Sequence, residues 1–389
     1  MKRNTYIILL LVTMAALSCY GQSQERYEKL LVEANQYFND EQYHLALELY
    51  NEALNFGKHA TEVDYYIAEC YRHTFDYAEA EAYYRKVLDS DPSGYPMALY
   101  YYPLMLKLNG HLSEAVSYFD RFIAFHVESS FLNDWVDQAI VERTGCEIAQ
   151  RELGISSPVQ AVLVPGDVNS SYNDFAPALR HAEALVITSS RIGSNRTLID
   201  ERDGEAFTDN YYFTKTIDGW EDRTRREFAI TNNRYHDGTG SFTNSGDVYY
   251  YTQCEAQCRI FETRFENGEW SKPVPLGELI NTSTSDAKQP AISPGGDTLY
   301  FASNRSGGYG GFDIWMSTRQ DQGQWSRPVN LGKSINTKAD ELAPTALPDP
   351  SMLFFSSTGH PGYGGFDFFV AKARTADTAY SKGDLILAR

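Results

Sequence analysis

Hydrophobic and polar positions follow two different periods along this chain, a helical one first and a strand-like one after it. In residues 24–153, aromatic and small residues recur at the three- and four-residue spacing of amphipathic helices. Beyond a short linker at 154–158, brief apolar runs alternate with Gly, Asn, Asp and Pro, as in strands joined by tight turns. The pattern predicts an α + β multidomain chain, with an α-solenoid followed by an all-β domain at 159–389.

The helical part contains an internal repeat of 34 residues. The repeated positions are Ala34, Tyr37, Tyr43, Ala46 and Tyr50, which return as Ala68, Tyr71, Tyr77, Ala80 and Tyr84. This period is that of the tetratricopeptide repeat, in which small residues lie where two helices approach closely. A looser third unit surrounds Ala115, and residues 131–153 form an expected closing helix. We therefore expect three helix pairs and a capping helix, with most of these Tyr and Ala residues in the core.

The second part contains a longer repeat, rich in aromatic residues and Gly turns. Residues 270–277 return as 325–332, Trp270 as Trp325, Asp286 as Asp340, and Asp313 as Asp367. Two sets of positions indicate four copies of the repeat. The outer-strand aromatics are Trp220, Trp270, Trp325 and Tyr380, and the strand entries are Asp174, His236, Asp286 and Asp340. Such repeats predict a β-propeller of about four blades. It is either a compact four-bladed form or a shortened member of a longer family.

The repeated aspartates have two interpretations. Asp286 and Asp340 either cap backbone N–H groups at the start of a strand or, with Asp174, hold a cation at the mouth of the propeller. Capping is the favoured interpretation, because repeats create such symmetry for packing reasons alone. Asp313 and Asp367 follow Gly-Gly-Phe, where a short carboxylate is expected to bond the turn.

Residues 1–21 are expected to be an export signal rather than part of the fold. Lys2 and Arg3 precede an apolar run that is too short to span a bilayer comfortably. Either Cys19 is lipidated after an imperfect lipobox, or the chain is cleaved after Gly21. Both alternatives predict a periplasmic protein, attached to the outer membrane in the first case. No later segment is apolar enough for a transmembrane helix.

Four further cysteines lie in the exported part. Cys254 and Cys258 lie between two strand-like runs, where an oxidising compartment favours a disulfide across the turn. A metal site would need further ligands nearby, and the sequence offers none. Cys70 and Cys146 lie in helical sequence and are expected to be buried thiols.

Charge and motifs narrow the classes of function. A formal net charge of −18 argues against nucleic-acid binding, which requires basic surfaces. The sequence contains neither a Gly-x-Ser-x-Gly elbow nor a His-Glu-x-x-His motif. It therefore predicts that the chain is not an enzyme and that it uses no cofactor or metal.

Four residues are candidates for contact with a protein partner. Tyr309 and Tyr363 lie on equivalent Gly-flanked loops, and aromatic residues at a rim are common binding hot spots. They could equally fold back over the edge of a blade. Arg72 and Lys107 are candidates by helical position, with solvated surface side chains as the plainer alternative.

The motifs together resemble a known family. Residues 293–305 resemble the TolB-like (WD-type) propeller repeat, and residues 307–315 with 325–332 are similar to its version in exported OmpA-family proteins of Bacteroidetes. One branch of that family is similar to the periplasmic lipoprotein component of the type IX secretion machinery. The resemblance implies protein partners in the envelope or outer membrane. The C-terminal OmpA-like domain of the family does not occur within residues 1–389, so peptidoglycan binding is not expected of them.

Two functional hypotheses follow. The first is a non-enzymatic exported adaptor that binds envelope proteins through the solenoid groove and the propeller, as solenoids do with extended or helical segments. The alternative is a propeller that binds a carbohydrate or a peptide as a periplasmic receptor or sensor.

Overall fold

The fold is described from a computed structural model of the chain. It describes residues 23–56, 60–125, 133–153, 162–192, 199–200, 204–224, 228, 231–321, 323–373 and 380–387, with only the backbone of 133–134, 373 and 380–387. The chain forms two compact units, Met1–Ala139 with Asp200–Glu205, and Ile140–Ile199 with Ala206–Arg389. The division falls inside a helix, whereas residues 154–158 lie outside the described residues, so the predicted domain boundaries stay predictions.

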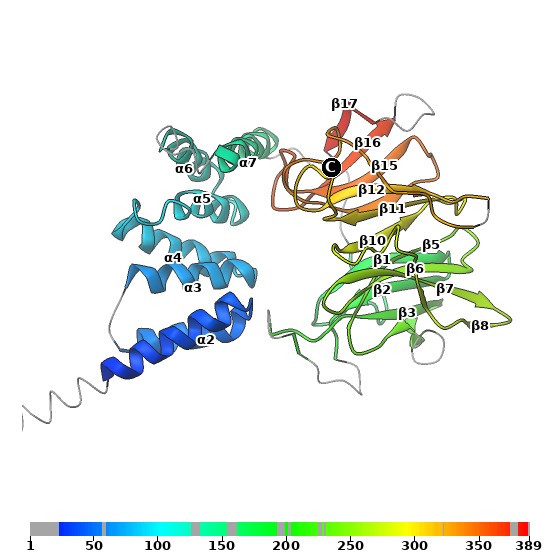
Figure 1. Cartoon of the computed structure of the whole chain (residues 1–389), viewed down its shortest axis with the longest axis horizontal. Coiled ribbons are helices and arrows are strands. Elements are labelled where there is room, and N and C mark those ends of the chain that lie inside the picture. Colours follow the sequence, from blue (N-terminus) through cyan, green and yellow to red (C-terminus); the bar gives the residue numbers. More distant parts are fainter. Residues whose placement is uncertain are drawn as a thin grey trace, which may run out of the picture. The chain divides into compact units, whose positions relative to one another are not determined.

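Seven helices are found in the described part of the N-terminal region (Figure 1). They are a helix over residues 23–39, α2 (Tyr43–Leu54), α3 (Thr61–His73), α4 (Tyr77–Ser90), α5 (Ala98–Leu108), α6 (Leu112–Phe125) and α7 (Asn133–Glu152). The first six pair in sequence order, and α7 follows them. The predicted succession of three helix pairs and one further helix is confirmed.

The repeated small residues explain how closely these helices pack. Ala34, Ala46, Ala68 and Ala80 are all fully buried. A methyl group is the largest side chain that lets two helix backbones approach at such positions, and the larger rings of Tyr37 and Tyr71 pack around the same core. The start of α4 is capped by the Asp76 carboxylate, which accepts the Glu79 backbone N–H at 3.2 Å.

Four antiparallel sheets form a four-bladed β-propeller. Blade 1 comprises β1 (Asp174–His181), β2 (Ala184–Ser189), β3 (Asp209–Thr216) and β4 (Gly219–Asp222). Blade 2 comprises β5 (His236–Phe242), β6 (Val248–Cys254), β7 (Cys258–Glu266), β8 (Glu269–Trp270) and β9 (Val274–Pro275). Blade 3 comprises β10 (Ala287–Ile292), β11 (Thr298–Ser303), β12 (Asp313–Thr318) and β13 (Val329–Asn330). Blade 4 comprises β14 (Glu341–Ala346), β15 (Met352–Ser357), β16 (Asp367–Ala373) and β17 (Tyr380–Leu387).

Tight turns join the first two strands of blades 2 and 3, where the sequence shows Gly-Asp. Gly246 and Gly296 have φ of 72° and 74°, a left-handed conformation that glycine adopts at little cost. Their backbone N–H groups donate to the carbonyls of Thr243 and Ser293, both at 2.8 Å. The sequence signal for these hairpins is therefore confirmed.

Each innermost strand contains one residue in the left-handed region at a break in register with the second strand. These residues are Ala176, Thr239, Gln289 and Ala343, with φ between 47° and 54°. None is a glycine, so the backbone of each is strained, and the packing and hydrogen bonds of the surrounding blade must offset the energy of this strain. Their shared conformation fixes which positions of the four blades are equivalent.

This equivalence corrects one alignment made from the sequence. The residues three places before the left-handed residue are Asn173, His236, Asp286 and Asp340. The residues two places before it are Asp174, Asp237, Ala287 and Glu341. The prediction placed Asp174 with Asp286 and Asp340, which is wrong by one residue. In a strand, an offset of one moves a side chain to the opposite face.

The N–H groups of the left-handed residues also tie each blade to the one before it. Thr239 N donates to Thr188 Oγ1 (2.7 Å), Gln289 N to Thr252 Oγ1 (2.8 Å), and Ala343 N to Gln289 Oε1 (2.8 Å). Thr188 and Thr252 occupy equivalent positions, where blade 3 has Ala302. Because Ala302 has no acceptor, the side chain of Gln289 supplies one instead.

Candidate functional site

A pocket of about 600 Å³ lies at the centre of the propeller and is lined by the innermost strand of every blade. Its walls are residues 177–182, 240–244, 290–292, 294, 344–346 and 348. Side chains at the opening include His181 and Asn244, which are exposed. The lining contains no carboxylate. It therefore lacks the pair of acids that glycoside hydrolysis uses.

The wall of this pocket is built largely from residues with little side-chain polarity. Pro177, Gly240, Pro290 and Pro344 each follow the left-handed residue of their strand. Proline has no N–H group, so three of the four positions leave no donor to satisfy. A Cβ on Gly240 would come within 2.4 Å of the Tyr249 ring and of the Tyr250 carbonyl oxygen, so this position admits no side chain.

The one guanidinium in the lining, that of Arg180, is already engaged by blades 1 and 2. Its Nε donates to the Gly246 carbonyl at 2.9 Å and its Nη1 to the Tyr212 hydroxyl at 3.2 Å. The same group lies over the rings of Phe265 and Trp270, at 4.2 and 4.9 Å from their centres. Arg180 therefore joins blades, and the pocket offers weak, mostly neutral chemistry to a ligand.

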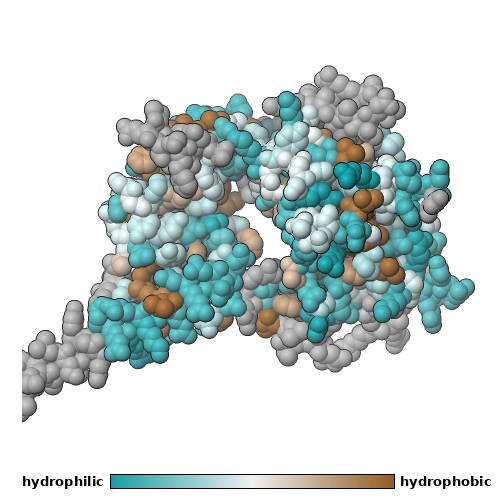
Figure 2. Space-filling view, in the orientation of Figure 1, coloured by the Kyte–Doolittle hydropathy of each residue, from teal (hydrophilic) through white to brown (hydrophobic). Residues whose placement is uncertain are grey.

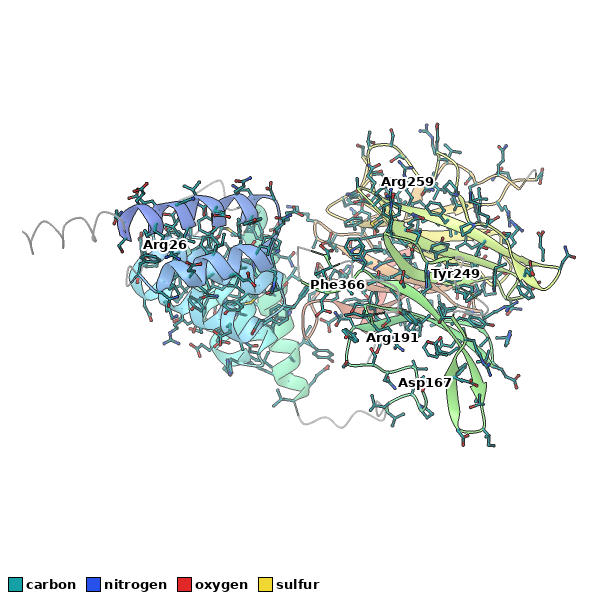
Figure 3. The ribbon with its side chains drawn as sticks, turned by 90° about the horizontal axis from the view of Figure 1, so that it is seen from below. Arg26, Asp167, Arg191, Tyr249, Arg259 and Phe366 are labelled. Atoms are coloured by element: carbon teal, nitrogen blue, oxygen red, sulfur yellow. A yellow bond between two sulfur atoms is a disulfide. The ribbon has the colours of Figure 1, made fainter. Side chains whose placement is uncertain are left out.

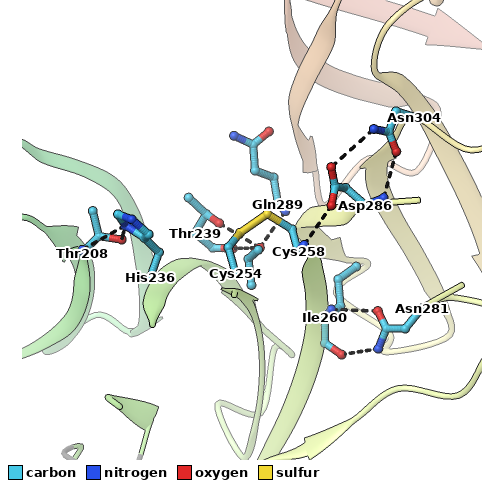
Figure 4. The surroundings of a disulfide bond; sticks show 11 residues. Thr208, His236, Thr239, Cys254, Cys258, Ile260, Asn281, Asp286, Gln289 and Asn304 are labelled. Carbon is cyan, nitrogen blue, oxygen red and sulfur yellow. Dashed lines mark hydrogen bonds between the residues drawn. A yellow bond between two sulfur atoms is a disulfide. The ribbon is translucent and has the colours of Figure 1, made fainter. Parts of the chain in front are cut away.

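The repeated acids at the strand entries act as backbone caps between neighbouring blades. Cys258 N donates to Asp286 Oδ1 at 2.9 Å, and Phe312 N donates to Asp340 Oδ1 at 2.7 Å (Figure 4 shows the first). His236 does the same in blade 2, where its Nδ1 accepts the Thr208 N–H at 3.2 Å. The favoured capping interpretation matches this geometry. Within the described residues, no group of three or more His, Cys, Asp or Glu could hold a metal.

Asp313 and Asp367 bond their own loops, in the manner expected after Gly-Gly-Phe. Asp313 Oδ2 accepts the Tyr309 N–H at 2.6 Å, and Asp367 Oδ2 accepts the Gly364 N–H at 2.9 Å. Asp313 is fully buried, and this burial raises the pKa of its carboxyl. Both carboxylates position loops instead of facing the central pocket.

Glu341 is a buried acid that the sequence analysis missed. Its carboxylate accepts Thr337 N (2.6 Å), Thr337 Oγ1 (2.7 Å) and Ser357 Oγ (2.7 Å). Burial raises the pKa of Glu341 to about 7, despite these donors. Its counterpart Asp174 accepts Ser189 Oγ and Arg191 Nη2, both at 2.6 Å. A carboxylate two residues before the left-handed residue occurs in blades 1, 2 and 4, and this was the available sequence signal. It was missed because Asp174 had been aligned with Asp286 and Asp340.

Cys254 and Cys258 form a disulfide between the end of β6 and the start of β7 (Figure 4). The Cys258 N–H is the same group that Asp286 caps, so the disulfide lies at the junction of blades 2 and 3. Cys70 and Cys146 are both buried. Cys19 lies outside the described residues.

The two loop tyrosines differ in their surroundings. The side chain of Tyr309 is 50 % exposed. The Tyr363 hydroxyl instead donates to the carboxylate of Glu152 at the end of α7, and the residue is half-buried. Of the two, Tyr309 is the one whose ring is largely open to a partner.

Arg72 lies in a polar network between α3 and α4. Its Nη2 donates to Glu69 Oε2 at 2.5 Å, its Nε donates to the Tyr84 hydroxyl at 3.2 Å, and Tyr84 in turn donates to Glu69. Burial alone lowers the pKa of Arg72, but the Glu69 carboxylate outweighs it and holds the pKa above its usual value. The guanidinium also lies 4.2 Å from the centre of the Tyr101 ring.

Lys107 does not lie at a free surface, which corrects its selection as a contact residue. Its side chain is only 4 % exposed, because α5 is packed against both α4 and α6. Helical position alone could not show this, since it gives the face of a helix but not how many neighbours cover that face.

Half-buried aromatic rings lie on alternate helices of the first unit. We call Tyr65, Tyr66, Tyr95, Tyr101 and Trp135 the aromatic strip. The ring centres of Tyr65 and Tyr95 are 5.1 Å apart, those of Tyr65 and Tyr66 are 5.9 Å apart, and those of Tyr101 and Trp135 are 5.9 Å apart. They come from α3, the segment before α5, α5 and α7. The sequence analysis assigned such rings to the core. The only sequence signal for a further role is the high number of tyrosines, 28 in the chain.

Among the helices that the structure describes, none is both long and apolar enough to cross a bilayer. On the face of the propeller unit in Figure 2, hydrophobic residues lie in small patches among hydrophilic ones.

Comparison with known proteins finds similarity only among solved structures. No protein-family model matches the chain, and no curated protein matches it. TolB from Acinetobacter baumannii is 15 % identical over 54 % of this chain and 43 % of its own, with a TM-score of 0.35. An alpha-L-arabinofuranosidase from Lactobacillus brevis is 12 % identical over 56 % and 73 %, with a TM-score of 0.34. Bacteroides ovatus xyloglucan PUL GH43B is 14 % identical over 58 % and 46 %, with a TM-score of 0.34.

These neighbours correct one prediction. The chain was expected not to be an enzyme, because it has a propeller and lacks short catalytic motifs. Solved chains similar to it include arabinofuranosidases and a GH43 protein, so that inference is wrong: a propeller of this kind does not separate binding from catalysis. The matched part spans less than half of the TolB and GH43B chains. The likeness concerns the arrangement of the blades and assigns no activity.

Proposed function

We propose that this chain binds a protein partner in the cell envelope, with the aromatic strip as the principal contact. The observation that carries the proposal is the strip itself, five half-buried aromatic rings on alternate helices of one unit and in the segment before α5. Tyr and Trp present large rigid surfaces at a low entropic cost, and they are enriched at the centres of protein interfaces.

Arg72 adds a defined charge beside these rings. Its guanidinium is held by Glu69 and Tyr84 under the Tyr101 ring, so it loses little freedom when a partner binds. A strip that crosses several helices fits an extended or helical segment of another protein. The finer features, which are the tetratricopeptide identity, the lipid anchor at Cys19, attachment to the outer membrane and a role in type IX secretion, are proposals that rest on the sequence resemblance.

A site-specific crosslink tests the strip. A photo-reactive phenylalanine replaces Tyr95 in one variant and Phe75 in the other, and both are exposed to light in envelope extract. Phe75 is exposed at the turn between α3 and α4, is not one of the strip residues, and serves as the matched control. We expect one discrete adduct from the Tyr95 variant alone. Equal adducts from both positions, or none from either, would contradict the proposal.

A second function is supported by the central pocket. Its volume of about 600 Å³ falls within the range of small-ligand sites, roughly 300–1,000 Å³. The neutral lining favours an uncharged ligand, such as an oligosaccharide or a short peptide. Titration calorimetry with both classes should show saturable binding that Ala346→Trp, which fills the pocket, abolishes. Val274→Trp, on an exposed strand elsewhere, should leave binding intact; if both variants bind as the natural chain does, the pocket is not the site.

A further inference from the structure

One side-chain arrangement joins successive blades three times. In the segment after the third strand of a blade, an Asn side chain pairs with the backbone of that strand, and we call this the clasp. Asn232 clasps Asn210 (2.9 and 2.8 Å), Asn281 clasps Ile260 (2.8 and 2.9 Å), and Asn336 clasps Ile314 (2.7 and 3.0 Å). Each amide accepts the N–H and donates to the C=O of one residue, so it continues the sheet where the strand itself has ended.

A fourth clasp residue precedes blade 1. Val168 and Asn169 match Ile280 and Asn281 in sequence, and both asparagines donate to a carbonyl five residues before them. Asn169 Nδ2 reaches the Val164 carbonyl at 2.5 Å, as Asn281 Nδ2 reaches that of Leu276 at 2.9 Å. Residues 164–170 are therefore built like the last part of a blade that would stand before blade 1.

Two arginines support this assignment. Arg191 donates to the carbonyls of Asp167 and Val168, and Arg305 donates to those of Leu279 and Ile280 (Figure 3 labels Arg191 and Asp167). In both cases Nε bonds the serine two residues earlier, at 2.9 and 3.0 Å. The segment before blade 1 is thus held as the junction between blades 2 and 3 is held, although no blade precedes it among the described residues.

The other half of the same clasp is found on blade 4. Phe368 pairs with Ser356 as Ile314 pairs with Ala302 and as Ile260 pairs with Thr252, so the three residues are equivalent. Ile260 and Ile314 are fully buried beneath the following blade, whereas Phe368 is 64 % exposed. Blade 4 therefore presents an apolar face on which blades 2 and 3 each receive a neighbour.

Blade 1 presents the complementary face. Leu179 lies three residues after the left-handed residue of its strand, the position that Ile292 holds in blade 3. Ile292 is packed against blade 2 and is 4 % exposed, whereas Leu179 is 63 % exposed. The two faces that the internal junctions bring together are thus both uncovered at the two ends of the propeller.

The four described blades do not close into a ring by themselves. The innermost strands β1 and β5, β5 and β10, and β10 and β14 pack in succession, but β14 and β1, both described in full, show no comparable packing. In Figure 1, β16 and β17 of blade 4 and β2 and β3 of blade 1 lie at opposite sides of the propeller unit. A partner with matching faces would cover both ends of the propeller in the way that the internal junctions are covered.

We propose that a second copy of this chain supplies those faces, so that two four-bladed units form one eight-bladed ring with twofold symmetry. The residue 164–170 segment and Leu179 of each copy then seat on the Phe368 face of the other. Eight blades lie within the range of known propellers, and a twofold axis makes both new junctions at once. The surface continues the junctions between blades 2 and 3 and between blades 3 and 4, so the proposal does not depend on the function proposed above.

Molar mass in solution tests this ring. The mature full-length chain should have twice the mass of one chain by light scattering. Phe368→Arg, which places a charge on an already exposed face, should halve that mass without loss of the thermal transition of the propeller unit. Ile217→Arg is the matched control, because Ile217 is exposed at the turn between β3 and β4, and it should keep the double mass. A natural chain with the mass of one chain at every concentration would overturn the proposal.

A pair of single-cysteine variants tests the junction itself. Asn169→Cys and Phe368→Cys should each remain uncrosslinked alone, because a twofold ring brings position 169 of one copy to position 368 of the other. Mixed and oxidised, they should give a covalent dimer on a non-reducing gel. If the mixture gives no covalent dimer, a second copy does not occupy this face. The same conclusion follows if a variant that carries both cysteines in one chain forms an internal disulfide and no dimer.

Discussion

At the scale of single residues, the junctions between blades depend on short polar side chains whose partners are backbone groups. Asp286, Asp340 and the clasp asparagines satisfy N–H and C=O groups at strand ends that would otherwise be buried without partners. A buried backbone group without a partner costs about 1–3 kcal/mol, so each of these residues matters more than its size suggests.

Asn336→Ala should therefore lower the free energy of unfolding of the propeller by about 2–4 kcal/mol, because both polar groups of Ile314 lose their partner in a buried place. Urea denaturation followed by tryptophan fluorescence measures the change. Asn244→Ala removes an exposed amide at the pocket opening and should change stability by less than about 0.5 kcal/mol. Equal effects of the two variants would show that the clasp contributes nothing.

Glu341 predicts a pH dependence with a defined sign. Its carboxyl has a pKa of about 7 in the folded state against an ordinary value of 4.5, because burial disfavours the charged form. Between these values the folded state binds more protons than the unfolded state, so the stability that the carboxyl contributes is full below pH 4.5 and is lost as pH rises through about 7. The loss amounts to about 3 kcal/mol.

Glu341→Gln should remove this loss, so its stability should fall less than that of the natural chain between pH 4.5 and pH 8. Chemical denaturation at a series of pH values gives the difference. Glu183→Gln, at an exposed acid, is the matched control and should follow the natural chain. Parallel curves for Glu341→Gln and the natural chain would contradict the assignment.

At the scale of elements, the innermost strands combine a strained residue with a bond to the preceding blade. The left-handed conformation of Ala343 costs an L-residue about 1–2 kcal/mol, and the hydrogen bond of its N–H to Gln289 helps to keep it there. The strain is retained because the break in register sends the following residues, from Pro344 onward, toward the central pocket.

Ala343→Gly should raise the free energy of unfolding by up to about 1 kcal/mol, because glycine adopts this conformation without strain. Ala346→Gly, in the same strand but outside the left-handed region, should lower it by about 0.5–1 kcal/mol. Paired urea melts of the two variants give the comparison. A loss of stability of similar size in both would show that position 343 is not strained.

At the scale of the whole molecule, the chain consists of two units with separate cores. The described clusters of buried residues each lie within one unit, in the helices or in the propeller. Because no described cluster is shared, one unit can unfold without removing the core of the other.

Calorimetry of the mature chain should therefore show two transitions. Ala80→Leu overfills a fully buried position between helices and should lower only one of them by several degrees. Asn336→Ala should lower only the other. The two variants together assign the transitions, and one shared transition that both variants shift would mean that the units unfold as one.

Much of the architecture could be predicted from local sequence patterns. The 34-residue spacing of Ala and Tyr predicted the helix pairs, because an amphipathic helix needs a small residue wherever a second backbone comes close. Gly-Asp turns and outer aromatics such as Trp270 and Trp325 predicted four blades, because hairpin turns and strand alternation are local properties. The capping role favoured for Asp286 and Asp340 followed from their place at the start of a strand.

Tertiary structure decided what depends on neighbours that are distant in the chain. The sequence analysis aligned Asp174 with Asp286 and Asp340, one residue away from its true counterpart, and therefore overlooked Glu341. The reason is that the break in register within each innermost strand is not visible in the local sequence pattern. The sequence analysis selected Lys107 as a contact residue from its helical position alone. The burial of Lys107 depends on the helices packed around α5, which the sequence does not show. Only the packed blades show that Asn169 and Phe368 hold clasp positions, because the exposure of a face depends on how the blades pack and not on a local pattern.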